Sequence, residues 1–457
     1  MSESADVLVV GGRCAGATLA TWLARAGVSV IVADRARFPS DTLSTHVFQG
    51  GAIASLRRLG ALDDVLATGA PPVTRGQISL GTGDDRVEAN VPMPVPAPGL
   101  PAMLCVRRVA LDEVLHRIAA EAGATMLDGW RVQELLREKG RVVGARLQGR
   151  DGEEREIRAR LIVGADGRNS TVAREVGARR YSVLPMERFG YFAYYEDVVA
   201  PEPETMTVVR DERLFGFAVP ADAGLHLACL MPPAADYSEF MDDVEAGWER
   251  EVDRLDGVRE LVATGRRVGR PRGLHAVDTY LRDGAGAGWA LIGDAGHFKD
   301  PAPGQGIADA FRQAERLAEA VGAGLRAGDL DRRLRAWWRW RDRDALLRHT
   351  WAHGFGAVGP PQHVLVQIIR DTLDRPDGPA RFWGPSMQSR SPSEALNGRA
   401  LLRAATRSVA RNGLSASQAA REVGDVVRRE ARYRRARRGA HTPGRRGLGR
   451  RPVEMEA

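Results

Sequence analysis

The chain has 457 residues, of which 44% are hydrophobic and 27% charged, so we expect a globular protein of two or three domains. Its net charge of +7 comes from the end of the chain: residues 391–457 contain 16 arginines and 6 acidic residues, which leaves the first 390 residues with a net charge of −3. This distribution excludes a uniformly basic nucleic-acid-binding protein, and no apolar run approaches the roughly 20 residues that a membrane span requires.

The first predicted unit, residues 6–34, is a strand, a turn, a helix and a strand. Residues 6–10 are a short apolar run, and residues 17–26, after a glycine-rich turn, have apolar side chains at helical spacing. A second apolar strand, residues 28–33, ends at Asp34. An acid at this place, about 20 residues after the turn, is typical of a dinucleotide site, where the helix N-terminus binds the pyrophosphate and the carboxylate binds the ribose.

The turn between these strands departs from the GxGxxG fingerprint. Gly11 and Gly16 are in place, but Arg13 stands where the middle glycine lets the backbone approach the phosphates. Either Arg13 blocks that approach, or its guanidinium swings onto a phosphate as a charged hydrogen-bond donor.

The following part of the chain alternates between predicted helices and short strands. We expect helices at 51–66 and 111–122, and strands at 125–127, 130–132 and 142–147. Lys139 and Gly140 fit the hairpin turn between the last two strands, and a Pro/Gly-rich passage at 71–101 predicts only short strands and loops.

A second strand that ends in an acid, residues 158–167 with Asp166, precedes a helix at 170–176. From residue 181 to about 277 the pattern changes to alternating segments typical of antiparallel strands. One helix is expected among them, at about 240–264. We interpret this passage as a second domain inserted into the first; its predicted strands are 188–195, 205–210, 214–219 and 225–230.

The chain then returns to the first domain with a buried strand at 289–294, which again ends in an acid, Asp294. A glycine- and proline-rich loop leads into a clear helix at 307–323. Further helices are expected at 330–353 and 362–374, and one amphipathic helix beyond residue 397. Residues 433–451 are too charged and too rich in glycine to bury a core alone.

Three motifs at these strand ends resemble those of FAD-dependent monooxygenases of the aromatic-hydroxylase type, a superfamily that includes flavin halogenases and isoprenoid reductases. The first is the turn GGRCAG with Asp34, and the second is the segment 166–174, which fits DGxxSxxR. The third is Gly293-Asp294, six residues, Pro301, and then Gly304-Gln305-Gly306. The resemblance covers residues 5 to 350.

The resemblance implies an α/β fold, with a Rossmann-like FAD-binding domain, an inserted antiparallel β-sheet substrate domain and a C-terminal helical region. The expected boundaries are 1–180 and 281–330 for the two parts of the FAD-binding domain, 181–280 for the substrate domain, 331–396 for the C-terminal helices and 397–457 for a basic, partly disordered tail.

The resemblance also implies a set of FAD-binding residues. The turn and strand-end positions are Gly11, Gly12, Arg13, Ala15, Gly16, Asp34 and Arg35, with Asp34 on the adenosine ribose. Arg108 should reach the pyrophosphate or ribityl region, unless it is a solvated arginine at a helix start. Val132 should meet the adenine edge, Asp166 should organise the pyrophosphate region without touching phosphate, and Asp294 should accept from a ribityl hydroxyl. The loop residues Pro301, Gly304, Gly306 and Ile307 should present free N–H groups to the flavin.

In this family the flavin performs the difficult chemistry. The resemblance implies FAD reduced by NAD(P)H, a C4a-hydroperoxyflavin, and hydroxylation or epoxidation of an aromatic or polyketide-like molecule. His46, in the loop near the flavin and substrate, is a candidate proton relay or hydrogen-bond donor, or else a structural histidine. Lys299 is either a loop cation or a catalytic residue, and no metal site is expected.

Three other functions are alternatives to a monooxygenase. Halogenases of this fold need a lysine in the N-terminal domain and a WxWxIP segment; here Lys139 lies in a predicted turn, and Trp337, Trp338 and Trp340 lie in a C-terminal helix without a following Ile-Pro. A double-bond reductase of the isoprenoid type stays open, because loss of oxygen reactivity leaves no clear sequence mark. Nucleic-acid binding rests on the arginines of 434–451 alone, without a groove-reading motif.

The cellular context follows from the same sequence. Residues 1–6 lack the basic start of a signal peptide, and Cys14, Cys105 and Cys229 lie far apart in apolar segments. We therefore expect a cytoplasmic protein with reduced cysteines, whose partners are a small-molecule substrate, oxygen and, in a two-component system, a flavin reductase. The choice between NADH and NADPH, the substrate and the oligomeric state leave no mark in the sequence.

Overall fold

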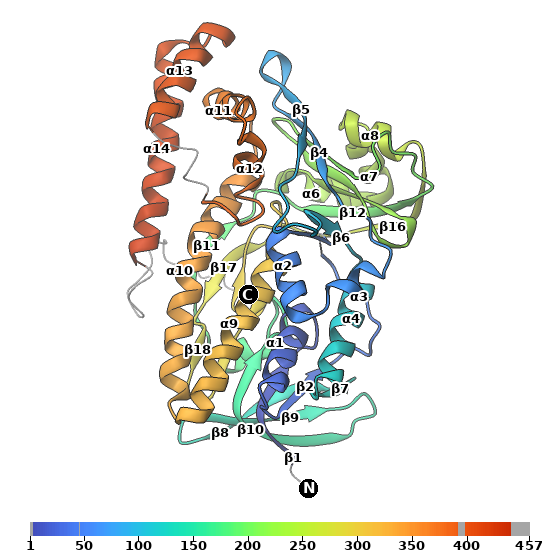
Figure 1. Cartoon of the computed structure of the whole chain (residues 1–457), viewed down its shortest axis with the longest axis vertical. Helices are drawn as coiled ribbons and strands as arrows, with labels where there is room; N and C mark the ends of the chain where they lie inside the picture. Colours follow the sequence, from blue (N-terminus) through green and yellow to red (C-terminus); the bar gives the residue numbers. More distant parts are fainter. Residues whose placement is uncertain (1–2, 45, 392–397, 440–457) are drawn as a thin grey trace.

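The computed structural model describes residues 3–44, 46–391 and 398–439. It has the expected α/β architecture, with a sheet and its helices in the lower half of Figure 1 and a second sheet in the upper half. Among the described residues, no helix is long and apolar enough to cross a membrane.

The first sheet has eight strands, with a parallel centre in the order β19-β10-β1-β2-β7 and the antiparallel edge strand β18. Val7 to Val10 of β1 pair with both neighbours and are buried, as the continuous apolar run predicts for a strand covered on both faces. The strands are β1 (Glu3–Val10), β2 (Val30–Asp34), β7 (Thr125–Asp128), β8 (Arg131–Glu138), β9 (Arg141–Gln148), β10 (Glu154–Gly164), β18 (Ala285–Gly286) and β19 (Trp289–Leu291).

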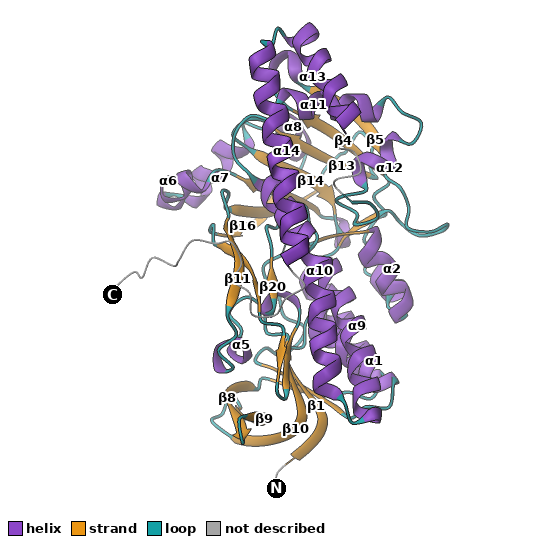
Figure 2. Cartoon of the chain, turned by 90° about the vertical axis from the view of Figure 1, so that its left-hand side faces the viewer, coloured by secondary structure: helices purple, strands orange, loops and turns teal. Residues whose placement is uncertain are grey.

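Helices α1, α9 and α10 pack beside this sheet (Figure 2), and together with α4 they bury one continuous core with it. The helix α1 begins three residues earlier than predicted, at Cys14, directly after the turn. The predicted helix at 51–66 is two helices, because Gly60 adopts the left-handed conformation that ends the first. The helices are α1 (Cys14–Arg25), α2 (Gly50–Leu59), α3 (Leu62–Leu66), α4 (Arg108–Glu121), α5 (Thr171–Glu175), α9 (Gly306–Ala327) and α10 (Leu330–Gly356).

The second sheet has seven strands in the order β16-β12-β15-β14-β13-β4-β5. Two of them come from the predicted first part of the FAD-binding domain, so residues 75–92 of the span 1–180 lie in the substrate-side sheet. The pair β13 and β4 is parallel, a departure from the expected all-antiparallel sheet. The strands are β4 (Arg75–Leu80), β5 (Val87–Pro92), β12 (Gly190–Glu196), β13 (Thr205–Arg210), β14 (Phe215–Pro220), β15 (His226–Met231) and β16 (Arg266–Leu274).

The two faces of this sheet have separate cores. On β12, Tyr191 and Tyr195 point to the face that holds Trp248, and Phe192 and Tyr194 point to the opposite face. Helices cover the first face, whereas the second face packs in part against Trp383 and Met387 of the C-terminal region and elsewhere faces the first sheet.

The single helix predicted at 240–264 is wrong. It is three helices, α6 (Tyr237–Asp242), α7 (Val244–Val252) and α8 (Asp256–Val262). Asp243 is extended, and its side chain accepts from the N–H groups of Glu245 and Ala246, so it starts a new helix at a point where the helical pattern continues.

Smaller sheets connect these parts. β11 (Arg180–Pro185), β17 (Asp278–Arg282) and β20 (His297–Phe298) form one, and β3 (Val47–Gln49) pairs with β6 (Met103–Cys105). Lys139 lies exposed, with a φ of 47°, in the turn between β8 and β9, as predicted.

The C-terminal region is helical, as expected, but its helices differ from the prediction. α11 (His363–Leu373) and α12 (Gly378–Trp383) are followed by two helices beyond residue 397, α13 (Gly398–Asn412) and α14 (Ala416–Gly439). These two helices occupy most of residues 398–439 of the tail expected at 397–457, and α14 lies beside α10 (Figure 1). The rest of that tail lies outside the described residues.

Candidate functional site

A cavity of about 830 Å³ lies at the carboxyl ends of the parallel strands, between the two sheets. The three predicted motifs all contribute to its wall. They also touch one another: a Cβ on Gly11 would lie 2.5 Å from the carbonyl oxygen of Ala165, and a Cβ on Gly293 would lie 3.1 Å from the Cβ of Ala15. The fold therefore brings the three motifs, which are far apart in the chain, together at one edge of the sheet. Their positions at the ends of parallel strands predict this arrangement.

The glycine turn is a tight cradle at the start of α1. Gly11 has a φ of +101°, and a Cβ on Gly16 would lie 1.8 Å from the carbonyl oxygen of Gly11, so neither position accepts a side chain without a shift of the backbone. No described side chain caps α1, and the cavity wall includes Cys14 and Ala15 in its first turn. The free N–H groups and the dipole of α1 suit a diphosphate.

Asp34 lies 7% exposed in the wall, at the end of β2. Its two oxygens accept from the N–H groups of Gly12, at 2.7 Å, and of Ala36, at 2.8 Å. These bonds fix the carboxylate beside the turn and leave it lone pairs for ribose hydroxyls. Arg35 is exposed and also lines the cavity, and Val132 is buried at the start of β8 in the same wall.

Arg13 lies in the cavity wall, and protein groups beside the turn hold its guanidinium. Its guanidinium donates to Asp112 Oδ2 at 2.7 Å and to the carbonyl and Oγ of Ser40, both at 2.8 Å. It also lies 5.3 Å from the ring of Phe38. The side chain thus holds the loop after β2 against α4, and its contact with the cofactor stays a prediction.

Asp112 is fully buried and organises a second arginine, Arg108. Arg108 Nη2 donates to both carboxylate oxygens at 2.8 Å, and Cys14 Sγ donates to Oδ1 at 3.3 Å. The interpretation of Arg108 as a solvated arginine is therefore wrong, since its side chain is only 11% exposed, pairs with Asp112 and lines the cavity. Its contact with the cofactor stays a prediction.

Asp166 lies at the cavity wall and binds the start of α5. Its carboxylate accepts from Ser170 Oγ and from the N–H group of Thr171, at 2.7 Å. Ser170 Oγ in turn accepts from the N–H group of Ala173, at 2.9 Å. Burial raises the pKa of Asp166, and these hydrogen bonds act in the opposite direction. The contacts agree with a structural role in the motif, which remains a prediction with respect to the cofactor.

Asp294 projects into the cavity from the short 3-10 turn after β19, which ends earlier than the predicted strand. Desolvation by the surrounding protein raises the pKa of Asp294 to about 6, and the positive charge of Arg108 acts in the opposite direction. The carboxyl is therefore an acceptor at neutral pH and takes up a proton under mildly acidic conditions.

The loop after β20 leads from the cavity wall into α9, whose first residue is Gly306. Gly304 has a φ of +65°, and a Cβ on Gly306 would meet no atom within 4 Å. Pro301 and Ile307 lie in the same wall. The start of α9, like that of α1, therefore faces the cavity with free N–H groups.

His46 is fully buried and does not lie in the cavity wall. Its Nε2 lies 3.0 Å from the hydroxyl of Tyr194, and its ring packs 4.9 Å from that of Phe192 on the second sheet. Burial, with the positive charge of Arg108, lowers the pKa of His46 to about 3. His46 is thus a neutral histidine at the junction of the two sheets, and its catalytic role stays a prediction.

This environment predicts a loss of stability in acid. The unfolded chain protonates His46 near pH 6.5, whereas the folded chain resists protonation down to about 3, so stabilisation by the neutral ring is lost as the pH falls through this window. Between pH 7 and pH 5, the wild type should lose about 2 kcal/mol more than His46→Gln, measured by urea unfolding. Equal losses in the two proteins would contradict a buried neutral histidine.

Lys299 is 5% exposed, which the reading as a loop cation did not anticipate. Its Nζ pairs with Asp309 and donates to Gln305 Oε1 at 2.8 Å. Both Lys299 and Asp309 contribute to the cavity wall.

Several residues of the site were missed by the sequence analysis. Tyr280 and Arg282 of β17 hold two of the motif loops together: the hydroxyl of Tyr280 donates to the carbonyls of Arg168 and Asp294, both at 3.0 Å. No local signal marks them, because their partners lie far away in the chain. The residues that form the cavity wall on and beside the second sheet were not predicted individually either. They are Met186, Gly190, Phe192, Cys229, Met231, Gly273 and Leu274.

The chain is similar to a known protein family and to several characterised flavoproteins. The profile of the family described as "FAD binding domain" matches residues 4–337. A menaquinone reductase of Mycolicibacterium smegmatis is 29% identical over 381 residues, which cover 78% of this chain and 84% of that protein. A 6-methylpretetramide 4-monooxygenase of Streptomyces rimosus is 28% identical over 357 residues, or 72% of this chain and 78% of that protein. Among solved structures, the flavin-dependent brominase Bmp2 has the same fold, with a TM-score of 0.74 at 20% identity over 90% of this chain and all of that one.

Proposed function

The chain belongs to the FAD binding domain family and is an FAD-dependent oxidoreductase; from this premise we propose that it is a monooxygenase of an aromatic or polyketide-like small molecule, with NAD(P)H as reductant. One oxygen atom of O₂ would enter the substrate and the other would leave as water, with two electrons from NAD(P)H and one further proton.

The residues of the cavity suit FAD. The cradle of Gly11 and Gly16 would hold the pyrophosphate at the start of α1, and Asp34 would hold the adenosine ribose. Asp294 would accept from the ribityl chain, and the start of α9 after Gly304 would face the pyrimidine edge of the flavin. The other proposed contacts are those of Gly12, Ala15, Arg35, Arg108, Val132, Pro301, Gly306 and Ile307.

When bound, FAD supplies the electron transfer and oxygen activation. The chain's own part is to orient the substrate and to exclude water. The carboxylate of Asp294 and the N–H groups at the start of α9 would position the ring system from one side, and the second sheet would cover it from the other.

The observation that carries the proposal is the character of this second wall. The cavity continues from the cofactor motifs to Phe192 and Met231 on the face of the second sheet that lies toward them, with Met186 and Leu274 beside them. Glycines at positions 190 and 273 add no side chains to the wall. A flat, apolar ring system would match such a wall by shape and by burial of apolar area.

A double-bond reductase is the second candidate, because the menaquinone reductase relative is as similar to this chain as the monooxygenase relative. Halogenation is disfavoured: Lys139 is exposed in a distant hairpin, and the other lysine, Lys299, is buried in an ion pair. Trp337, Trp338 and Trp340 lie on α10 rather than in a WxWxIP segment.

The test is incubation of the FAD-loaded protein with NAD(P)H, isotopically labelled oxygen and a panel of phenolic and polycyclic compounds, with and without an added flavin reductase. We expect at least one product with a single labelled oxygen atom, and faster NAD(P)H oxidation in its presence. A product that has gained two hydrogens and no oxygen would replace the proposal with the reductase. Turnover only with the added enzyme would make this a two-component oxygenase.

A further inference from the structure

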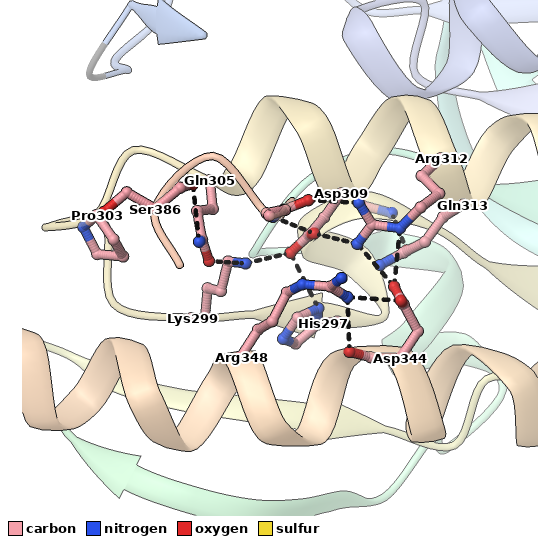
Figure 3. A network of polar contacts seen from close by, with 12 residues as sticks. His297, Lys299, Pro303, Gln305, Asp309, Arg312, Gln313, Asp344, Arg348 and Ser386 are labelled. Atoms are coloured by element: carbon pink, nitrogen blue, oxygen red, sulfur yellow. Dashed lines mark hydrogen bonds and ion pairs between the residues drawn. The ribbon is translucent and has the colours of Figure 1, made fainter. Parts of the chain in front are cut away.

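A buried network of alternating charges begins at the cavity and runs outward through α9 and α10 (Figure 3). Lys299 pairs with Asp309, and Arg312 donates to Asp309 Oδ1 and to Asp344 Oδ2, both at 2.6 Å. Arg348 Nη1 donates to Asp344 Oδ1 at 2.5 Å and is the last member of the network. Lys299 and Asp309 both lie in the cavity wall, and each carboxylate lies between two cations.

The network fixes Lys299 from two sides. Burial lowers the pKa of Lys299 to about 8, and the negative charge of Asp309 acts against this shift. Burial would raise the pKa of Asp309, but Lys299 and Arg312 outweigh it and hold that pKa far below its ordinary value. Lys299 therefore carries its charge at neutral pH while its side chain is only 3% exposed.

A segment outside the family match holds this arrangement in place. Gln305 accepts from Lys299, and its Nε2 donates to the carbonyls of Pro385 and Ser386 at 2.8 and 3.0 Å. Gln388 donates to Asp309 Oδ1 at 2.9 Å and accepts from Arg312. The C-terminal region thus contributes to the position of a cation in the cofactor wall.

His297 gives a second sign that the network faces a ligand. It is 4% exposed and lines the cavity; its Nδ1 lies 3.9 Å from Asp309 Oδ2, and neither ring nitrogen has a hydrogen-bond partner among the described residues. Burial lowers its pKa well below the ordinary value, so the ring is neutral, with a donor and an acceptor to offer. Buried polar groups without partners are rare, and a bound group would satisfy this one.

We propose that Lys299, held by Asp309 and Gln305, is the cation that stabilises the negative charge of the reduced cofactor. Hydride transfer from NAD(P)H delivers two electrons and one proton and releases NAD(P)⁺, so the bound cofactor gains one negative charge. A fixed ammonium in a water-poor wall stabilises that charge without reorganisation. The inference rests on the proposed FAD site but not on oxygenation, because reduction precedes any reaction with oxygen.

The test is the midpoint potential of bound FAD, measured anaerobically against a reference dye for wild type, Lys299→Met, Lys299→Gln and Lys139→Met. Loss of the cation should weaken binding of the reduced relative to the oxidised cofactor about tenfold, which for two electrons is about 30 mV lower in potential. Lys139→Met removes the other lysine, which is exposed, and should match the wild type.

Lys299→Gln removes the charge but retains a polar group beside Gln305, so its potential is used if the methionine variant does not load FAD. Lys299→Arg keeps the charge and should recover most of the wild-type potential. A potential of Lys299→Met or Lys299→Gln that equals that of Lys139→Met would overturn the proposal, whatever the oxygenase activity. Product formation is scored separately, so failure of the oxygenase proposal is distinguishable from failure of this one.

Discussion

Gly16→Val should yield a protein without FAD. The new Cβ would lie 1.8 Å from the carbonyl oxygen of Gly11 and 3.1 Å from Val9 Cγ1, so the turn must open before any side chain fits. Overpacking of this kind costs typically about 1–3 kcal/mol, and here the atoms that must move are those that would cradle the pyrophosphate. We expect purified Gly16→Val to lack the flavin absorbance band and to bind added FAD at least a hundredfold more weakly.

The control is Gly51→Ala in α2, where a Cβ would lie 3.6 Å from the nearest atom, the carbonyl oxygen of Met387. It should load FAD as the wild type does. Circular dichroism of both variants separates loss of the cofactor from loss of the fold. Full FAD occupancy in folded Gly16→Val would show that the cofactor does not use this turn.

Asp309→Ala should be the most destabilising single substitution in the charged network. It leaves the ammonium of Lys299 buried with only Gln305 as a partner, whereas Arg312 keeps Asp344. Removal of one member of a buried pair costs about 3–5 kcal/mol. We expect a decrease of this size in the unfolding free energy of the apo protein, measured by urea denaturation.

The double variant Lys299→Met with Asp309→Ala should regain much of that loss, because no buried charge is left without a partner. Asp425→Ala is the matched surface control: its pair with Arg428 is solvent-exposed and should cost less than about 1 kcal/mol. If the double variant is no more stable than Asp309→Ala, the loss does not come from an unpaired Lys299.

The sequence predicted the centre of the fold because local pattern and tertiary position agree there. The apolar runs of β1 and β2 and the glycine turn leave few alternatives, and the positions of Asp34, Asp166 and Asp294 after parallel strands place them at one sheet edge. The helix α9 was predicted within a few residues for the same reason, since its apolar face is continuous.

Other features depend on contacts that no local pattern records. Residues 75–92 join the second sheet because β4 pairs with β13 in parallel, and nothing in their composition predicts that pairing. Asp243 breaks a continuous helical pattern by capping a new helix. Lys299 sits in a loop in the sequence, and only folding brings Gln388 and Arg348 into the network that surrounds it.

The most direct test of the oxygenase is the lifetime of the reduced flavin in air. The FAD-loaded protein is reduced anaerobically with a stoichiometric amount of NAD(P)H and then mixed with oxygenated buffer while the flavin absorbance is followed. We expect reoxidation within seconds, with one O₂ consumed per NAD(P)H. Reduced flavin that persists for minutes in air, and reoxidises on addition of a quinone or another acceptor with a double bond, would contradict it and establish a reductase.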